Sequence, residues 1–156
     1  MKALVVFESQ FGNTEKIARA IGTGLDAPVR HAGEITPADL DGLALLVVGS
    51  PTQRMTYVDG MKAFLEGIPA SGLKGVKIAA FDTRISNEEM QALVKSSVTR
   101  FMVRVFLHRF AAAPIATALK KAGGKQVVKP EGFFVTDTEG PLRDGELERA
   151  EEWGRK

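Results

Sequence analysis

Small polar residues follow the first apolar run of the sequence and precede a helical pattern. Residues 9–14, SQFGNT, offer two hydroxyls, two amides and a glycine. Backbone N–H groups at the start of a helix, supported by hydroxyl side chains, can bind a phosphate without a cationic side chain. The spacing matches neither GxxxxGK[ST] nor, in this first turn, GxGxxG. The loop therefore either binds an anion in another way or only caps the following helix, through Ser9 or Asn13.

Two further polar segments follow apolar runs. GSPTQRMT (49–56) comes after LALLVV (43–48), and FDTRI (81–85) comes after VKIAA (76–80). Such continuous apolar runs, like KALVVF at the start of the chain, are typical of strands buried on both faces. Because strands alternate with helical patterns, we expect an α/β fold with a parallel sheet and helices on both faces. Ligands bind at the carboxyl ends of such strands, where the three polar loops should converge.

Helical and strand patterns alternate along the rest of the chain. They predict, in chain order, a helix at 14–25, a weak strand at 28–32, a helix at 58–68 and a strand at 125–135. Pro130 should interrupt this last strand, and Pro114 should break the long helical region before it. No repeat or linker divides the sequence, so we expect a single domain over residues 1–156.

A strongly charged segment, RDGELERAEEWGRK (143–156), closes the chain. It predicts a helix with Asp144 as its N-cap. Glu146 and Glu148 would complement the positive end of the helix dipole.

The composition excludes several kinds of site. The 156 residues include no cysteine, which excludes disulfides, thiolate chemistry and cysteine-ligated metal centres. The only histidines, His31 and His108, lie far apart in the sequence and give little support for a metal site. No uncharged apolar stretch approaches about 18 residues, and the first apolar run is too short for a signal peptide. We therefore expect a cytoplasmic protein, with no nucleic-acid partner.

Three polar loops and the end of the chain carry a family resemblance. SQFGNTEKIA (9–18) resembles the phosphate loop of flavodoxins, which has a hydroxyl residue, two variable positions, glycine, a small polar residue and threonine. GSPTQ (49–53) and AAFDTR (79–84) are similar to the second and third flavin loops of that family. PEGFFVTDTEGPLRDGELERAEEWG (130–154) is similar to the ending of a group of bacterial and archaeal flavodoxin-like proteins. The resemblance covers nearly the whole chain in the expected order.

This resemblance implies a three-layer, flavodoxin-like fold that binds flavin mononucleotide (FMN). Its five-stranded parallel sheet would have the order 2-1-3-4-5. The residues around the phosphate would be Ser9, Gln10, Phe11, Gly12, Asn13 and Thr14. The residues beside the isoalloxazine would be Pro51, Thr52, Gln53 and Arg54 on one side, and Asp82, Thr83 and Arg84 on the other.

Several residues depart from the flavodoxin pattern. Phe11 stands where many flavodoxins have a hydroxyl, and the second and third loops lack the Trp and Tyr that sandwich the ring in electron carriers. Met55 or Tyr57 could replace them, unless Tyr57 only starts the next helix. The pI of about 9.0 also differs from that of the acidic electron carriers. Arg54, Arg84 or both could favour two-electron reduction beside the flavin, or both could simply be solvated or paired with Asp82 or Glu66.

The resemblance thus implies a redox protein that transfers electrons through FMN, with a redox partner protein or a quinone-like small molecule. Two alternatives stay open. One is an FMN-dependent quinone or protoporphyrinogen oxidoreductase. The other is a flavodoxin fold without cofactor that serves as a binding module.

An additional helical segment is expected after the fourth strand, at about residues 86–113. Within it, EEMQALVKSSVTRFMVRVFLHRF (88–110) reads as a basic amphipathic helix. The helix could pack on the domain, form a homodimer interface or a lid, or make peripheral contact with a membrane to reach a quinone. Menaquinone-dependent protoporphyrinogen oxidases also carry a long insert on a flavodoxin-like domain.

Overall fold

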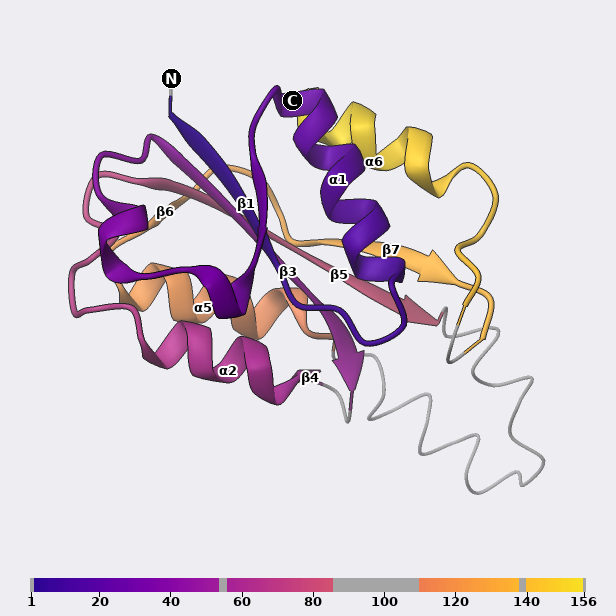
Figure 1. Cartoon of the computed structure of the whole chain (residues 1–156), viewed down its shortest axis with the longest axis horizontal. Helices are drawn as coiled ribbons and strands as arrows, with labels where there is room; N and C mark the ends of the chain where they lie inside the picture. Colours follow the sequence, from indigo (N-terminus) through magenta and orange to yellow (C-terminus); the bar gives the residue numbers. More distant parts are fainter. Residues whose placement is uncertain (1, 54–55, 86–109, 138–139, 156) are drawn as a thin grey trace.

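A parallel sheet forms the centre of the molecule (Figure 1). The computed structural model describes residues 2–53, 56–85, 110–137 and 140–155. The parallel strands are β1 (Ala3–Phe7), β2 (Val29–His31), β3 (Leu45–Gln53), β5 (Lys77–Ile85), β6 (Lys125–Gln126) and β7 (Glu131–Val135). A short strand, β4 (Thr56–Tyr57), pairs antiparallel with β3.

The strand order confirms the predicted topology. The sheet runs β2-β1-β3-β5-β6, and β7 also pairs with β5. Because β6 and β7 lie along the same edge of β5 on either side of Pro130, together they are the fifth strand of the order 2-1-3-4-5. Proline has no N–H to give to a sheet, so the interruption falls where the sequence predicted it.

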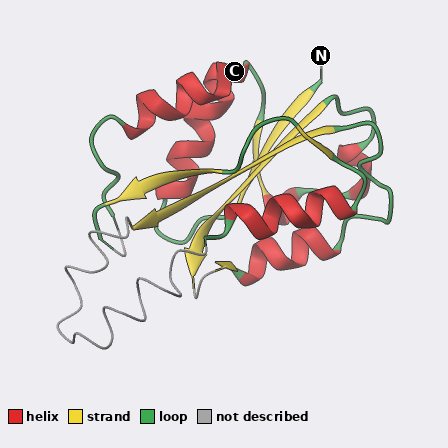
Figure 2. Cartoon of the chain, turned by 180° about the vertical axis from the view of Figure 1, so that it is seen from behind, coloured by secondary structure: helices red, strands yellow, loops and turns green. Residues whose placement is uncertain are grey.

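Within the described residues, two pairs of helices cover the sheet (Figures 1 and 2). α1 (Asn13–Leu25) and α6 (Glu146–Arg155) lie on one face, and α2 (Asp59–Glu66) and α5 (Ala112–Lys121) lie on the other. Two short 3-10 helices, η1 (Ala32–Glu34) and η2 (Pro37–Leu40), connect β2 to β3. Each face of the sheet has its own apolar core, because successive strand side chains point to opposite faces.

The helices α1 and α6 approach each other closely at two glycines. A Cβ atom on Gly24 would lie 2.1 Å from the carbonyl oxygen of Glu151, and one on Gly154 would lie 2.5 Å from that of Ile21. No side chain could occupy either space without moving a backbone. The two glycines therefore set the distance between the helices.

Charged groups tie the start of α6 to β7. One carboxylate oxygen of Glu146 accepts from the Phe134 N–H at 2.7 Å and from Arg149 at 2.7 Å. Arg149 also reaches Glu131 at 3.1 Å. Burial acts to raise the pKa of Glu146, but the hydrogen bonds from Arg149 and Phe134 hold this pKa below its ordinary value.

Three local predictions are wrong. α5 begins at Ala112 and includes Pro114, so no break occurs at the proline. A proline is tolerated there because first-turn N–H groups have no helical partner. Gly145, with φ of +86°, directly precedes α6, so Asp144 is not its N-cap. Tyr57 belongs to β4 and does not start α2.

Most of the additional helical segment predicted at about 86–113 lies outside the described residues. Its basic stretch at 88–110, including His108, lies there almost entirely. Among the helices that the structure describes, none is both long and apolar enough to span a membrane.

Candidate functional site

The three polar loops meet at a cavity beside the carboxyl ends of β1, β3 and β5. Its volume is about 280 Å³. Its walls are formed by Gln10, Phe11, Asn13, Thr14, Pro51, Thr52, Thr83, Arg84, Ile85 and Val135. Most of the residues predicted for the phosphate and the ring therefore line one space. Arg54 lies outside the described residues, and the Gln53 side chain is not described.

The first loop is shaped by Ser9 and Gly12. The Ser9 hydroxyl accepts a hydrogen bond of 3.0 Å from the Gly12 N–H, which closes the turn before α1. Gly12 has φ of +91°, a left-handed conformation that glycine adopts without strain, and no atom of the described residues lies within 4 Å of where its Cβ would stand. Gly12 is the N-cap residue of α1, so neither Ser9 nor Asn13 occupies that position, and the Ser9 hydroxyl instead holds the N–H of the N-cap residue.

Two buried hydroxyls join this loop to β5. Thr14 Oγ1 and Thr83 Oγ1 lie 2.7 Å apart, and both residues are almost fully buried. One hydroxyl must donate to the other. If Thr83 donates, the Thr14 O–H can still donate to a ligand in the cavity.

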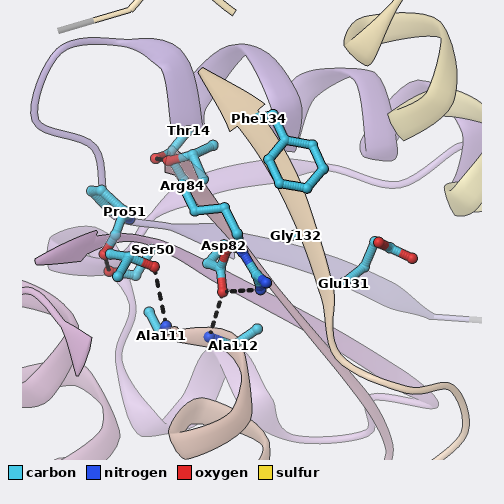
Figure 3. A network of polar contacts seen from close by, with 12 residues as sticks. Thr14, Ser50, Pro51, Asp82, Arg84, Ala111, Ala112, Glu131, Gly132 and Phe134 are labelled. Atoms are coloured by element: carbon cyan, nitrogen blue, oxygen red, sulfur yellow. Dashed lines mark hydrogen bonds and ion pairs between the residues drawn. The ribbon is translucent and has the colours of Figure 1, made fainter. Parts of the chain in front are cut away.

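The fully buried Asp82 and the partly buried Arg84 form an ion pair at the same edge (Figure 3). Two hydrogen bonds of 2.6 Å join the guanidinium to the two carboxylate oxygens, and the Ala112 N–H donates to Asp82 at 2.9 Å. Burial raises the pKa of Asp82, although Arg84 and the Ala112 N–H favour its charged form. Of the alternatives considered for Arg84, the structure thus has the pair with Asp82.

Arg84 is also packed between two neighbouring elements. Its Cζ lies 3.7 Å from the centroid of the Phe110 ring. Figure 3 shows it beside Gly132 on β7, where an added Cβ would lie 2.2 Å from Arg84 Cζ. The side chain is therefore fixed in one direction by Asp82, Phe110 and the absence of a side chain at Gly132.

The second loop is anchored through hydroxyl groups. The buried Ser50 hydroxyl donates to the Pro51 carbonyl at 2.9 Å and accepts from the Val58 N–H at 3.2 Å. The Thr52 hydroxyl accepts from the Ala111 N–H at 3.1 Å. These bonds fix the loop against the start of α2 and the start of α5.

Sequence reasoning missed several residues around this cavity. Ile85 and Val135 line it, but in the sequence they read only as the ends of apolar strands. Gly140 follows β7 and approaches the Asn13 side chain so closely that an added Cβ would lie 2.5 Å from Asn13 Nδ2. One signal was present: Asp82 and Arg84 are two positions apart on a strand, which places both side chains on the same face.

A second polar pair lies beside the first loop. His31 Nδ1 accepts from the Gly33 N–H at 3.0 Å, so a neutral ring carries its hydrogen on Nε2, which lies 2.8 Å from Glu8 Oε1. Glu8 also accepts from the Ser9 N–H at 3.2 Å. Among the described residues no group of three or more His, Cys, Asp or Glu could hold a metal ion.

Comparison with known proteins identifies the fold. No protein-family model matches the chain, and no curated protein matches its sequence. A flavodoxin from the domain Archaea matches with a TM-score of 0.70 at 21% identity, covering 99% of this chain and 94% of that one. Flavodoxin 1 from Bacillus cereus matches with a TM-score of 0.70 at 19% identity, and the match covers 99% of this chain and 95% of that one. A WrbA-like flavodoxin protein from Agrobacterium tumefaciens matches with a TM-score of 0.70 at 16% identity, and the match covers 99% of this chain and 92% of that one.

These matches run from one end of the chain to the other. Together with the strand order, they show that the molecule has a flavodoxin-like fold. The candidate cavity lies at the carboxyl ends of its strands, the edge at which open α/β sheets bind their ligands.

Proposed function

We propose that this chain binds FMN at the candidate cavity and serves as an electron-transfer protein. The observation that carries the proposal is the meeting of two different surfaces in one space. The start of α1 offers N–H and hydroxyl donors, whereas Phe11, Pro51, Ile85 and Val135 offer apolar walls. A phosphate needs the hydrogen-bond donors, and a flat aromatic ring needs the apolar walls.

The phosphate would lie against the start of α1. Gly12 leaves open space there, and the first-turn N–H groups of a helix have no carbonyl partners within it. Ser9 uses an oxygen lone pair to hold the Gly12 N–H, so its own O–H can donate to a phosphate oxygen. Thr83 would act as a positioning residue, donating to Thr14 and orienting the Thr14 O–H toward the same anion.

The ring would lie toward the second and third loops. Ser50 and the Thr52 hydroxyl hold the second loop in place, and the Asp82–Arg84 pair holds the third. When bound, the flavin supplies the redox chemistry, and the protein supplies its orientation and surroundings. Because Asp82 compensates the charge of Arg84, we do not expect this arginine to favour two-electron reduction strongly.

The neighbours named flavodoxins support this proposal through the fold. The electron partner would be a redox protein or a quinone-like small molecule that reaches the exposed edge of the ring. Phe11, with 46% of its surface exposed, is an apolar contact that the described mouth of the cavity offers to such a partner.

The test is a pair of titrations followed by flavin fluorescence. The purified protein should show the visible bands of an oxidised flavin, and the flavin-free protein should bind FMN at least tenfold more tightly than riboflavin. Thr83→Val should weaken FMN about tenfold, since losing an oriented hydrogen bond to a charged group costs roughly 1.5 kcal/mol. Thr23→Val, an exposed position on α1, is the matched control and should leave the affinity unchanged.

Two results would contradict parts of the proposal separately. Equal affinities for FMN and riboflavin would exclude the phosphate site at α1. Failure to bind either flavin would exclude the redox function and favour a cofactor-free binding module.

A further inference from the structure

A second cavity lies at the opposite end of the sheet, under the last turns of α1 and α6. Its volume is about 340 Å³. It is lined by Ile21, Gly24, Leu25, Leu45, Val47, Lys77, Ala79, Val127, Val128, Trp153, Gly154 and Arg155. None of these residues lines the candidate flavin cavity. The two spaces are therefore separate, and this one has no role in the proposed electron transfer.

The larger part of the wall of this second cavity is apolar. Trp153 forms part of them, and its indole packs edge to face against Phe81 and Phe133, with ring centroids 6.3 and 6.0 Å away. Val127 is 44% exposed, so an apolar side chain stands where a ligand would enter. The volume is near the lower end of the range of about 300–1,000 Å³ for small-molecule pockets. A short apolar chain suits such a space.

One exposed lysine lines this cavity, and a second lies next to it on the neighbouring strand. Lys77 lines it from β5, and no described carboxylate forms an ion pair with the Lys77 ammonium. Lys125 on β6 is in register with Lys77, so the two side chains lie on the same face of neighbouring strands. Like charges placed side by side on a sheet repel each other, and an anion between them would relieve that repulsion.

The other side of the cavity is less suited to an anion. Arg155 already pairs with Glu151. The carbonyl ends of α1 and α6 also carry partial negative charge, which disfavours an anion beside them. An anionic group would therefore lie at the lysines, with its apolar part extending toward Trp153.

We propose that this cavity binds a medium-chain fatty acid. The carboxylate would lie between Lys77 and Lys125, and the acyl chain would pack against Val127, Trp153 and Ala79. The proposal does not depend on the flavin site, because no residue is shared between the two cavities.

The chain contains a built-in reporter, since Trp153 is its only tryptophan. Octanoate titrated into the full-length protein should give a saturable change in tryptophan fluorescence. Lys77→Gln should weaken octanoate at least fivefold and change the affinity for 1-octanol less than twofold, because the alcohol has the chain without the charge. Lys16→Gln, an exposed lysine on α1 outside the cavity, is the matched control and should change neither.

A second variant tests the mouth of the cavity without disturbing the core. Val127→Asp places a carboxylate at an exposed position and should weaken octanoate more than octanol. Three results would overturn the proposal: no saturable fluorescence change, equal effects of Lys77→Gln and Lys16→Gln, or displacement of octanoate by FMN. The last result would place octanoate in the flavin cavity.

Discussion

The two ends of the sheet enclose open space in different ways. At the carboxyl ends of the strands, buried polar groups are paired with one another: Thr14 with Thr83, and Asp82 with Arg84 and the Ala112 N–H. At the opposite end, most of the wall is apolar, and the two charged side chains that line it, Lys77 and Arg155, are exposed. One cavity is therefore held open by hydrogen bonds and the other by the spacing of two helices.

This difference indicates what each end tolerates. A buried polar group that loses its partner carries the full cost of its desolvation, so single substitutions at the polar end should be costly. At the apolar end, exposed charges contribute little to folding, and the packing of the helices should dominate. The following variants test that contrast, from the largest expected effect to the smallest.

Asp82→Ala should have the largest effect. It leaves the partly buried Arg84 guanidinium and the buried Ala112 N–H without their acceptor, and we expect a loss of about 3 kcal/mol in the free energy of unfolding. Urea denaturation measures this loss. Glu15→Ala, which removes an exposed i,i+4 pair with Arg19, should cost less than about 0.5 kcal/mol. Similar losses for the two variants would remove the contrast between buried and exposed pairs.

Gly154→Ala tests the apolar end. The added methyl group would meet the Ile21 carbonyl and force α1 and α6 apart, which should cost about 2 kcal/mol and lower Tm. Glu152→Ala, an exposed position on α6, should have little effect in the same thermal melt. If Gly154→Ala is as stable as the parent protein, the close spacing of α1 and α6 is not what keeps this cavity open.

Glu146→Gln tests how much the Glu146 carboxylate at the start of α6 contributes to stability as the pH changes. The folded-state pKa of Glu146 is lowered, so the stability from this carboxylate is present above its unfolded pKa and is lost as the pH falls through the folded value. The variant should be less stable by about 1.5 kcal/mol at neutral pH, and this difference should shrink below about pH 4.5. Urea denaturation across that pH range measures it. A difference that stays constant would contradict a role for the ionised carboxylate.

Thr14→Val should have the smallest effect of the four. It leaves the buried Thr83 hydroxyl without its partner and should cost about 1 kcal/mol. The double variant Thr14→Val with Thr83→Val removes both hydroxyls and should recover most of that loss. Additive losses in urea denaturation would show that the two hydroxyls do not stabilise each other.

The same contrast explains what could be predicted from the sequence. The polar end was predictable because its residues form short contiguous loops, each directly after a strongly apolar strand. Parallel topology then brings these loops to one edge of the sheet. The apolar cavity could not be predicted, because it takes two or three residues from each of five distant segments, and most of these residues read as ordinary core.

Pairings and helix starts were also beyond prediction. The sequence places Asp82 and Arg84 on one face of a strand, but it does not show that Gly132 and Phe110 leave the guanidinium only the direction toward Asp82. The start of α6 was placed at Asp144 from capping preference alone. In the structure, Glu146 bonds the Phe134 N–H, and this tertiary contact accompanies a start one residue later, after Gly145.

The close glycine contact between α1 and α6 also has a consequence for the order of folding. This contact joins segments far apart in the sequence and should therefore form late. Until α6 is complete, the core around Phe81 and Phe133 lacks the covering ring of Trp153. A folding intermediate in which α6 has not yet packed would therefore expose apolar surface, and such surface makes intermediates prone to aggregation.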